Sequence, residues 1–347
     1  MGAPNLQINL LIFFGSLVMS SSLVPLMRLL AFKYSILDNP NQAHKTHSKS
    51  TPYLGGLAIV IPITILALIG PFIFSNTLDY LNRILTILFP ALLLSLLGLY
   101  DDIRNLSAKF RLVVQSLLAF SITIYLMDLG FMVRVLDSNV TNILLSIFWL
   151  VGITNAFNFF DNLDGGAAGI TVIASSSLFL LSSWSGQYLI SSFCIALAGS
   201  ALGFLFWNKN PAKIFLGDSG SLFIGFLLAV SLLQFQPRIE SQFASALTPV
   251  FVLAIPIIDI IVAVISRLFR GVSIFQGGRD HLSHRLISKG LTRRASAHVL
   301  WGVSSLFSLV SLSLYFVPNE IAEFLSALTM ICMGLIVVWF LRIEVRN

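Results

Sequence analysis

Long apolar stretches, separated by short polar segments, run through the whole chain. Each stretch holds roughly 17 to 25 residues, enough for a helix to cross a hydrocarbon core of about 30 Å. Inside a bilayer only helices or closed barrels satisfy every backbone group, so the pattern predicts an all-α fold, a polytopic membrane helix bundle of about eleven transmembrane helices. The stretch 167–183 is short and Ser-rich, which leaves ten helices as the alternative. The predicted spans are 7–32, 53–74, 83–100, 110–127, 140–157, 167–183, 188–206, 219–236, 246–266, 298–316 and 320–341.

The composition agrees with this class. Of 347 residues, 56% are hydrophobic and 10% are charged, whereas a soluble domain has about a quarter charged residues. No soluble appendage, low-complexity linker or clear repeat interrupts the pattern, so residues 1–347 are interpreted as a single integral membrane domain.

Basic residues predict the orientation in the membrane. With eleven spans, 18 of the 21 Lys and Arg residues fall on one side, and only Arg83, Arg134 and Arg238 fall on the other. Because Lys and Arg are enriched in cytoplasmic loops, the N-terminus is expected outside and the C-terminus in the cytoplasm. The basic residues are spread among loops instead of gathered on one domain, so no nucleic-acid partner is expected; membrane lipids are.

The chemistry-bearing residues gather in five segments on the predicted cytoplasmic side. A transporter usually places ionisable groups near the bilayer midplane, whereas these groups sit at one interface. The arrangement favours an enzyme that acts on a lipid headgroup with a cytoplasmic co-substrate, and it leaves a lipid transporter or flippase as the alternative. The segments are 33–52, 101–109, 158–166, 207–218 and 267–297.

Asp101 and Asp102 follow directly on the apolar run 84–100. Two carboxylates at the C-terminal end of a helix repel the helix dipole and each other. A divalent cation or a proton transfer would offset this cost. The structural alternative is an exposed loop that ends in a Ser107 helix cap.

Two further segments combine amides, carboxylates and glycines. Between Asn155 and Gly165, paired amides and carboxylates could hydrogen-bond a nucleotide base and ribose, or they could only cap helices around a Gly turn. In the segment Asn208–Ser221, Asp218 begins a predicted helix. It could be the N-cap, or the turn could present backbone N–H groups to a phosphate while the carboxylate binds Mg²⁺.

The last segment holds Arg279, His281, His284 and Arg285. Two histidines three residues apart share one face of a helical turn, and with the arginines they form a cationic grip for a diphosphate. Zinc is disfavoured because no third ligand is evident, and an anionic-lipid patch is the structural alternative. Asp259, an acid inside a span, suits a polar helix contact and a catalytic role equally well.

In order along the chain, Asp101-Asp102, Asn155–Gly165, Asn208–Ser221 and Arg279–Arg285, together with Thr51–Gly56, resemble the motifs of the polyprenyl-phosphate N-acetylhexosamine-1-phosphate transferases. The resemblance covers residues 38–286. It implies transfer of a GlcNAc-like sugar-1-phosphate from a UDP-N-acetyl sugar to undecaprenyl phosphate with Mg²⁺ (or Mn²⁺), releasing UMP. It also implies the initiating step of cell-envelope polysaccharide synthesis, a bacterial cytoplasmic membrane, an active site facing the cytoplasm, and compatibility with a homodimer.

The resemblance also implies roles for individual residues. Asp218, Asp101 and Asp102 correspond to metal ligands. The catalytic set comprises Asp101, Asp102, Asp164, His281 and His284. The substrate-binding set comprises Lys45, His47, Asn155, Asn158, Asp161, Asn208, Arg279 and Arg285.

This chain departs from the family pattern at four positions: Tyr53 replaces an Arg, Asn162 a Gly, Gly166 a Leu and Ser283 a His. The carboxylates remain, but the departures leave the sugar open. The triple-histidine run of the phospho-MurNAc-pentapeptide enzymes is absent, which favours the branch that handles a smaller N-acetylated amino sugar. Phospho-MurNAc-pentapeptide transfer and an inactive paralogue are the remaining alternatives.

Overall fold

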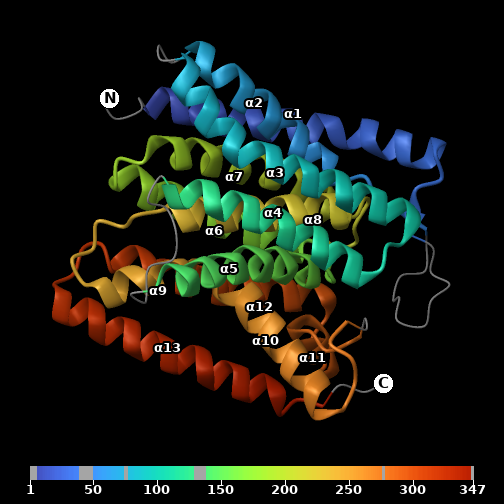
Figure 1. The fold of residues 1–347 in the computed structure, drawn as a ribbon. Coiled ribbons are helices and arrows are strands. Elements are labelled where there is room, and N and C mark those ends of the chain that lie inside the picture. The colour runs from blue at the N-terminus through green and yellow to red at the C-terminus, as the bar shows by residue number, and fades with distance from the viewer. Residues whose placement is uncertain (1–5, 39–49, 74–76, 129–137, 276–277, 345–347) are drawn as a thin grey trace.

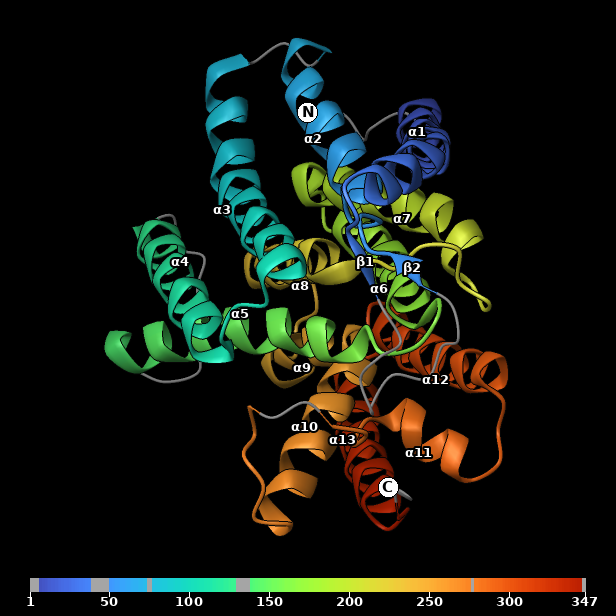
Figure 2. The ribbon, with the colours of Figure 1, turned by 90° about the vertical axis from the view of Figure 1, so that its right-hand side faces the viewer.

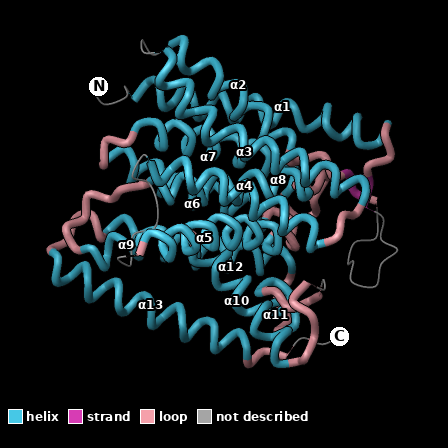
Figure 3. Tube along the Cα trace, in the orientation of Figure 1, coloured by secondary structure: helices cyan, strands magenta, loops and turns pink. Residues whose placement is uncertain are grey.

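The computed structural model describes residues 6–38, 50–73, 77–128, 138–275 and 278–344. Helices make up nearly all of this part of the chain, as the trace in Figure 3 shows. They are α1 (Leu6–Lys33), α2 (Leu57–Ile73), α3 (Thr77–Arg104), α4 (Ala108–Asp128), α5 (Asn139–Phe160), α6 (Gly166–Trp184), α7 (Tyr188–Asn208), α8 (Gly217–Gln234), α9 (Gln242–Val252), α10 (Ala254–Phe269), α11 (Leu282–Ser288), α12 (Arg293–Ser313) and α13 (Asn319–Leu341). Two short strands, β1 (Leu37–Asp38) and β2 (Thr51–Pro52), form an antiparallel pair in which Leu37 lies opposite Pro52 and Asp38 opposite Thr51.

The all-helical prediction is confirmed, and every predicted apolar stretch is helical, including the Ser-rich one that forms α6. The count of eleven spanning helices is not confirmed. In the described part of the chain, nine helices are long and apolar enough to cross a membrane, or ten if a bent pair counts as one span. The remaining stretch forms α2, whose apolar part, Leu57–Gly70, is shorter than a full span.

The bent pair is α9 and α10, which meet at Leu253 with an angle of 75°. Pro249 lies inside α9 and Pro256 in the first turn of α10. Proline lacks a backbone donor and its ring crowds the carbonyl four residues earlier. For Pro256 that carbonyl belongs to Val252, the last residue of α9, so Pro256 accounts for the break at Leu253. The predicted span 246–266 is therefore two helices with different directions.

The helices run alternately in opposite directions, and this brings the polar loops together (Figure 1). The C-terminal ends of α3, α5 and α7 and the N-terminal ends of α4, α6 and α8 lie on the right-hand side of that view. The strand pair and α11 lie at the same end, which faces the viewer in Figure 2. Antiparallel packing therefore gathers segments that are far apart in the sequence.

Helix α8 forms the centre of the bundle, with nearly every side chain buried. Its neighbours include α3 and α5, while α7 packs between α1 and α6. The outer helices α1 and α13 expose large apolar side chains such as Phe14, Leu29, Phe324 and Leu335. These surfaces suit contact with lipid, because a bilayer solvates apolar side chains.

A close approach of α3 to the N-terminus of α8 sets the distance between the two acidic motifs. Gly98 faces the backbone of Asp218 and Ser219, where a Cβ atom would overlap the Asp218 carbonyl. Three residues earlier on the same face, the Ser95 and Ser219 hydroxyls are 3.0 Å apart. One turn further along α3, Asp102 reaches the first turn of α8.

We expect Gly98→Ala to push α3 away from α8, because the added methyl meets backbone atoms that cannot rotate aside. Overpacking of this kind costs about 1 to 3 kcal/mol, and the altered spacing should lower activity by about tenfold or more. Thermal unfolding and turnover of the purified variant measure both effects. Gly302→Ala is the matched control, since a Cβ at Gly302 meets no atom within 4 Å; equal behaviour of the two variants would contradict the packing argument.

Candidate active site

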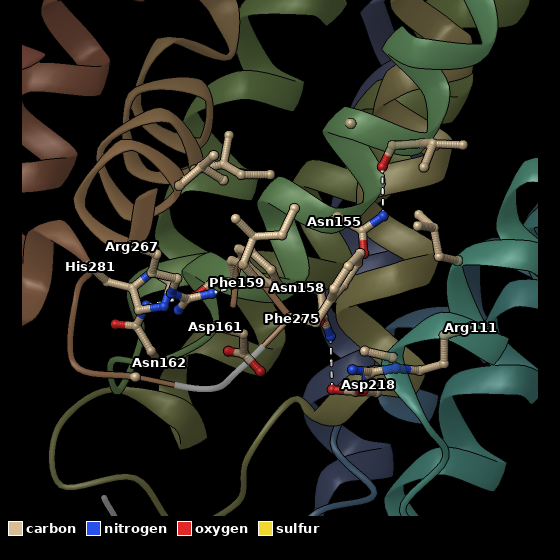
Figure 4. A pocket seen from close by; sticks show the side chains of 18 of the residues that line it. Arg111, Asn155, Asn158, Phe159, Asp161, Asn162, Asp218, Arg267, Phe275 and His281 are labelled. Carbon is tan, nitrogen blue, oxygen red and sulfur yellow. Dashed lines mark hydrogen bonds and ion pairs between the residues drawn. The ribbon is translucent and has the colours of Figure 1, made fainter. Parts of the chain in front are cut away.

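A cavity of about 930 Å³ opens at the end of the bundle where the polar loops meet. Its walls come from α4, α5, α10, the α5–α6 loop, the start of α8 and the segment before α11 (Figure 4). Nine of the residues predicted from the sequence line it: Asn155, Asn158, Asp161, Asp164, Asn208, Asp218, Arg279, His281 and His284. Lys45 and His47 lie outside the described residues.

Asp102 caps helix α8 from a neighbouring helix. Its Oδ1 accepts a hydrogen bond from the Asp218 N–H at 2.9 Å and its Oδ2 accepts one from the Ser219 N–H at 3.2 Å. A carboxylate is favoured at this end of a helix, where unpaired N–H groups concentrate positive potential. Asp102 thus supplies the capping contact, and the side chain of Asp218 is left for other partners.

Asp101 and Asp218 share one cation. The Nη1 atom of Arg111, at the start of α4, contacts Oδ2 of both carboxylates. The other oxygen of Asp218, Oδ1, accepts a hydrogen bond from Asn158 Nδ2 at 2.8 Å, and this contact is visible in Figure 4. Helices α3, α4, α5 and α8 therefore meet at one charged centre.

The donor chemistry of this centre suits magnesium, because carboxylate oxygens are the ligands that Mg²⁺ prefers. Within the described ranges, no three His, Cys, Asp or Glu side chains are already arranged around a common point. The guanidinium of Arg111 stands between two of the candidate ligands and supplies the positive charge there. The residues fit the metal by charge and atom type, provided that Arg111 moves aside.

Asp161 lies just beyond the C-terminal end of α5 and faces the same centre. Burial raises the pKa of its carboxyl well above the ordinary range, and the nearby Asp218 and Asp102 carboxylates raise it further. The cavity therefore holds an excess of negative potential that a cation or a proton would relieve.

Asn208 and Asp164 brace two loops against each other. Asn208 accepts a hydrogen bond from the Gly165 N–H at 3.0 Å and donates one to the Ile214 carbonyl at 2.9 Å. Asp164 accepts hydrogen bonds from Asn210 Nδ2 at 2.7 Å and from the Ala212 N–H at 3.1 Å. Gly165, with φ +72°, provides the left-handed turn that this geometry requires. Both predicted residues line the cavity, and their hydrogen bonds join the α5–α6 loop to the α7–α8 loop beside it.

The two histidines of the last motif occupy different environments. His281 Nδ1 lies 2.8 Å from a carboxylate oxygen of Asp259. His284, whose ring centre is 5.8 Å from that of His281, has a buried Nδ1 atom without a hydrogen-bond partner in the described part of the chain. Burial, followed by the charge of His281, lowers the pKa of His284 to about 4. At neutral pH His284 is therefore uncharged.

The chain resembles known membrane transferases over most of its length. Residues 84–236 match the model of glycosyl transferase family 4. A probable undecaprenyl-phosphate N-acetylglucosaminyl 1-phosphate transferase of Bacillus subtilis is 34% identical over 307 residues, which cover 87% of this chain and 84% of that protein. This chain belongs to glycosyl transferase family 4.

Other members of family 4 are more distant but equally long matches. The phospho-N-acetylmuramoyl-pentapeptide-transferase of Anoxybacillus flavithermus is 32% identical over 319 residues, covering 87% of this chain and 95% of that protein. That of Staphylococcus carnosus is 29% identical over 320 residues, covering 86% and 96%. The predicted resemblance is confirmed, and with its apolar helices the chain is a multi-pass membrane protein.

One predicted substrate-binding residue of this family 4 chain lies elsewhere. Arg285 is 2% exposed and does not line the cavity. Its guanidinium donates to the carbonyls of Phe340 and Ile343 at 2.9 and 2.6 Å, to the Asp280 carbonyl at 2.9 Å and to Ser266 Oγ at 2.8 Å. Its position does not support substrate binding, because these contacts instead cap the C-terminal end of α13.

Three cavity-lining arginines, Arg111, Arg267 and Arg293, were not predicted from the sequence. Arg111 was counted only for topology, although a basic residue at the start of an apolar helix, ten positions after an acidic pair, was the available signal. Arg267 pairs with Asp280 at 2.9 Å and lies 5.5 Å from the centre of the Phe159 ring. Local spacing in the sequence predicts neither the contact of Arg111 with Asp218 nor that of Arg267 with Asp280.

The environment of His284 yields a prediction about its titration. In the ligand-free protein we expect His284 to stay neutral from about pH 8 down to about pH 5.5, because its imidazolium form is poorly solvated. Nitrogen-15 spectra of histidine-labelled protein, assigned with His284→Gln, measure this. The exposed His298 serves as the internal control; a His284 midpoint near that of His298 would contradict the prediction.

Proposed function

We propose that the protein transfers a GlcNAc-like N-acetylhexosamine-1-phosphate from a UDP-sugar to undecaprenyl phosphate. The products are a polyprenyl-diphospho-sugar and UMP, and the reaction begins the synthesis of a cell-envelope polysaccharide. The observation that carries this proposal is a charged centre in which Arg111 contacts Asp101 and Asp218 and Asp102 caps α8 at Asp218. Arg111, Asp161 and Asp218 of this group line a cavity that also has an apolar wall. The named activity of the Bacillus subtilis relative supports the sugar and the lipid.

Both substrates are anionic, so the site must reduce their mutual repulsion. An oxygen of the lipid phosphate attacks the phosphorus attached to the sugar, and the bond from that phosphorus to the UMP oxygen breaks. Arg111, Arg267 and Arg279 border the cavity and supply positive charge along this path. Bound Mg²⁺ would supply further charge neutralisation and align the phosphates.

The three carboxylates Asp101, Asp102 and Asp218 have different proposed roles in binding that ion. Both oxygens of Asp102 accept hydrogen bonds from backbone N–H groups of α8. Asp101 and Asp218 instead share the side chain of Arg111, which is long enough to change its conformation, unlike the backbone of a helix. Asp101 and Asp218 are therefore the proposed direct ligands, and Asp102 orients Asp218. When Arg111 is displaced, its guanidinium remains near the cavity and can reach a phosphate.

An apolar wall extends from the charged centre along α5 and α10. It is formed by Leu144, Ile147, Phe148, Val151, Ile260 and Val264. A polyprenyl phosphate has a charged head and a long apolar tail, so this combination fits the lipid better than a soluble acceptor. Asn155, Asn158 and Asp161 supply the polar groups proposed for the nucleotide.

Phospho-MurNAc-pentapeptide transfer is the second candidate. It is favoured by the 29 to 32% identity of relatives with that name over most of this chain. The two candidates use the same lipid and release the same nucleotide, so only the sugar donor distinguishes them.

We expect the purified protein to release UMP from a UDP-N-acetyl sugar when undecaprenyl phosphate and Mg²⁺ are present, and EDTA to stop the release. A panel of UDP-GlcNAc, UDP-GalNAc and UDP-MurNAc-pentapeptide, with mass analysis of the lipid product, identifies the donor. Lipid binding without UMP release from any donor would contradict the proposal and favour the hypothesis of a lipid transporter or flippase.

Replacing the central acids tests the assignment of residues. We expect Asp101→Asn, Asp102→Asn and Asp218→Asn each to lower turnover by about 100-fold or more, because each change removes a negative charge from the centre. Turnover and the size-exclusion profile are measured on the same samples. Glu320→Gln, an exposed acid in the first turn of α13, is the matched control. Full activity in a central variant would contradict the assignment.

The proposed cytoplasmic active site requires a defined topology. We expect a fluorescent protein fused after residue 347 to fold in the cytoplasm, and a cysteine introduced before residue 6 to react with a membrane-impermeant reagent from outside. This follows from the unequal placement of Lys and Arg. The reverse labelling pattern would place the cavity on the external side and contradict the use of UDP-sugars from the cytoplasm.

A further inference from the structure

A fully buried carboxylate lies in the middle of α10. Asp259 has no exposed surface, and its neighbours along the helix are apolar. An acid in such surroundings loses its hydration and persists only when polar partners replace the water.

Both oxygens of Asp259 contact the first turn of α11. Oδ1 accepts a hydrogen bond from the Leu282 N–H at 2.7 Å, and Oδ2 lies 2.8 Å from His281 Nδ1. His281 lines the cavity, where its ring centre lies 5.9 Å from that of Phe159 and the two rings are nearly perpendicular. Asp259 itself does not line the cavity.

From these contacts we infer that Asp259 is a positioning residue for His281. Asp259 keeps the hydrogen of the His281 ring on Nδ1 and thereby directs Nε2 at the reacting phosphates. An ionised carboxylate only accepts hydrogen bonds, so the Nδ1 atom that faces it must carry the hydrogen. The remaining nitrogen, Nε2, then accepts a proton when His281 is neutral and donates to a phosphate oxygen when it is charged. The inference rests on the proposed phosphoryl transfer.

Within the described residues, the other groups at this turn are less suited to the task. His284 on the same turn is kept neutral by burial. Asp280, the residue before His281, is engaged by Arg267 and Arg270. Arg279 and Arg293 also border the cavity, and an arginine does not accept a proton. Asp161 and Asp164 line the cavity from the loop after α5 and do not belong to this turn.

A purely structural anchor would not need to be a carboxylate. The same turn has a second anchor, because Ser283 Oγ donates to Asn162 Oδ1 in the loop after α5. That contact is made by neutral groups and joins segments 121 residues apart. An asparagine at position 259 could likewise accept from the Leu282 N–H, yet its amide could also donate to Nδ1 and move the ring hydrogen to Nε2. Only the carboxylate excludes that tautomer.

The first test is the tautomer of His281. The chain contains five histidines, so nitrogen-15 spectra of histidine-labelled protein can be assigned with His281→Ala. We expect the wild type to show hydrogen on Nδ1 and the isosteric Asp259→Asn variant to show it on Nε2. Hydrogen on Nε2 in the wild type would overturn the inference without any variant, as would an unchanged spectrum in folded Asp259→Asn.

The second test is a double-mutant cycle on UMP release. We expect Asp259→Asn to lower kcat by about 10- to 100-fold with little change in KM, the range seen when a partner that orients a functional histidine is removed. In the His281→Ala background, the same change should cost less than about twofold, because the effect passes through His281. An effect of equal size in both backgrounds would overturn the inference.

Ser283→Ala is the matched control, since it removes an anchor of the same turn but keeps the carboxylate. We expect it to leave the hydrogen on Nδ1; movement to Nε2 would mean that anchoring of the turn, and not Asp259, decides the tautomer, which overturns the inference. A wild type with hydrogen on Nδ1 that releases no UMP from any donor would contradict the proposed function while supporting the placement of His281.

Discussion

The contact between Asp102 and the N-terminus of α8 is the constraint on which the site depends. Asp102 caps the central helix only because Gly98 allows α3 to approach the backbone at Asp218. The cap satisfies orphan N–H groups at the buried start of α8 and offsets the cost of a carboxylate at the end of α3. Two unfavourable features, a buried helix start and an acid at a helix C-terminus, thus stabilise each other.

Charge balance then determines how many acids the site can hold. Asp101 and Asp218 share Arg111, Asp280 is held by Arg267 and Arg270, and Asp259 is held by a histidine and a backbone N–H. Each group has its own partners, so the proposed exchange of Arg111 for a metal cation would leave the second and third groups in place. Asp161 faces the first group, and burial, followed by the nearby carboxylates of Asp218 and Asp102, raises the pKa of Asp161.

Much of this arrangement could be predicted from the sequence. Apolar length alone predicted every helix that is long enough to span a membrane. The alternation of their directions explains why loops whose contacting residues are 43 or more positions apart meet at one end. The break at Leu253 was not predicted, because the apolar run continues through it and only Pro249 and Pro256 mark it. The roles of the cations were hardest to predict. Arg111 and Arg285 have the same chemistry, and the difference between them comes from helices α8 and α13, which are far away in the sequence.

The break between α9 and α10 explains how the histidine turn reaches the cavity. α9 packs against α12 and α13, and α10, after the 75° bend, also packs against α5. The new direction lets Ile260, Val264 and Arg267 line the cavity, and Asp259 on the same helix holds the start of α11. At the far end of α10, Ser266 meets Arg285, which caps α13. Helix α10 therefore has two proposed duties, which fall to different residues. Ile260 and Val264 form the wall proposed for an apolar tail, and Asp259 fixes the polar turn proposed to face the phosphates. The second duty accounts for an acid in the middle of an apolar helix.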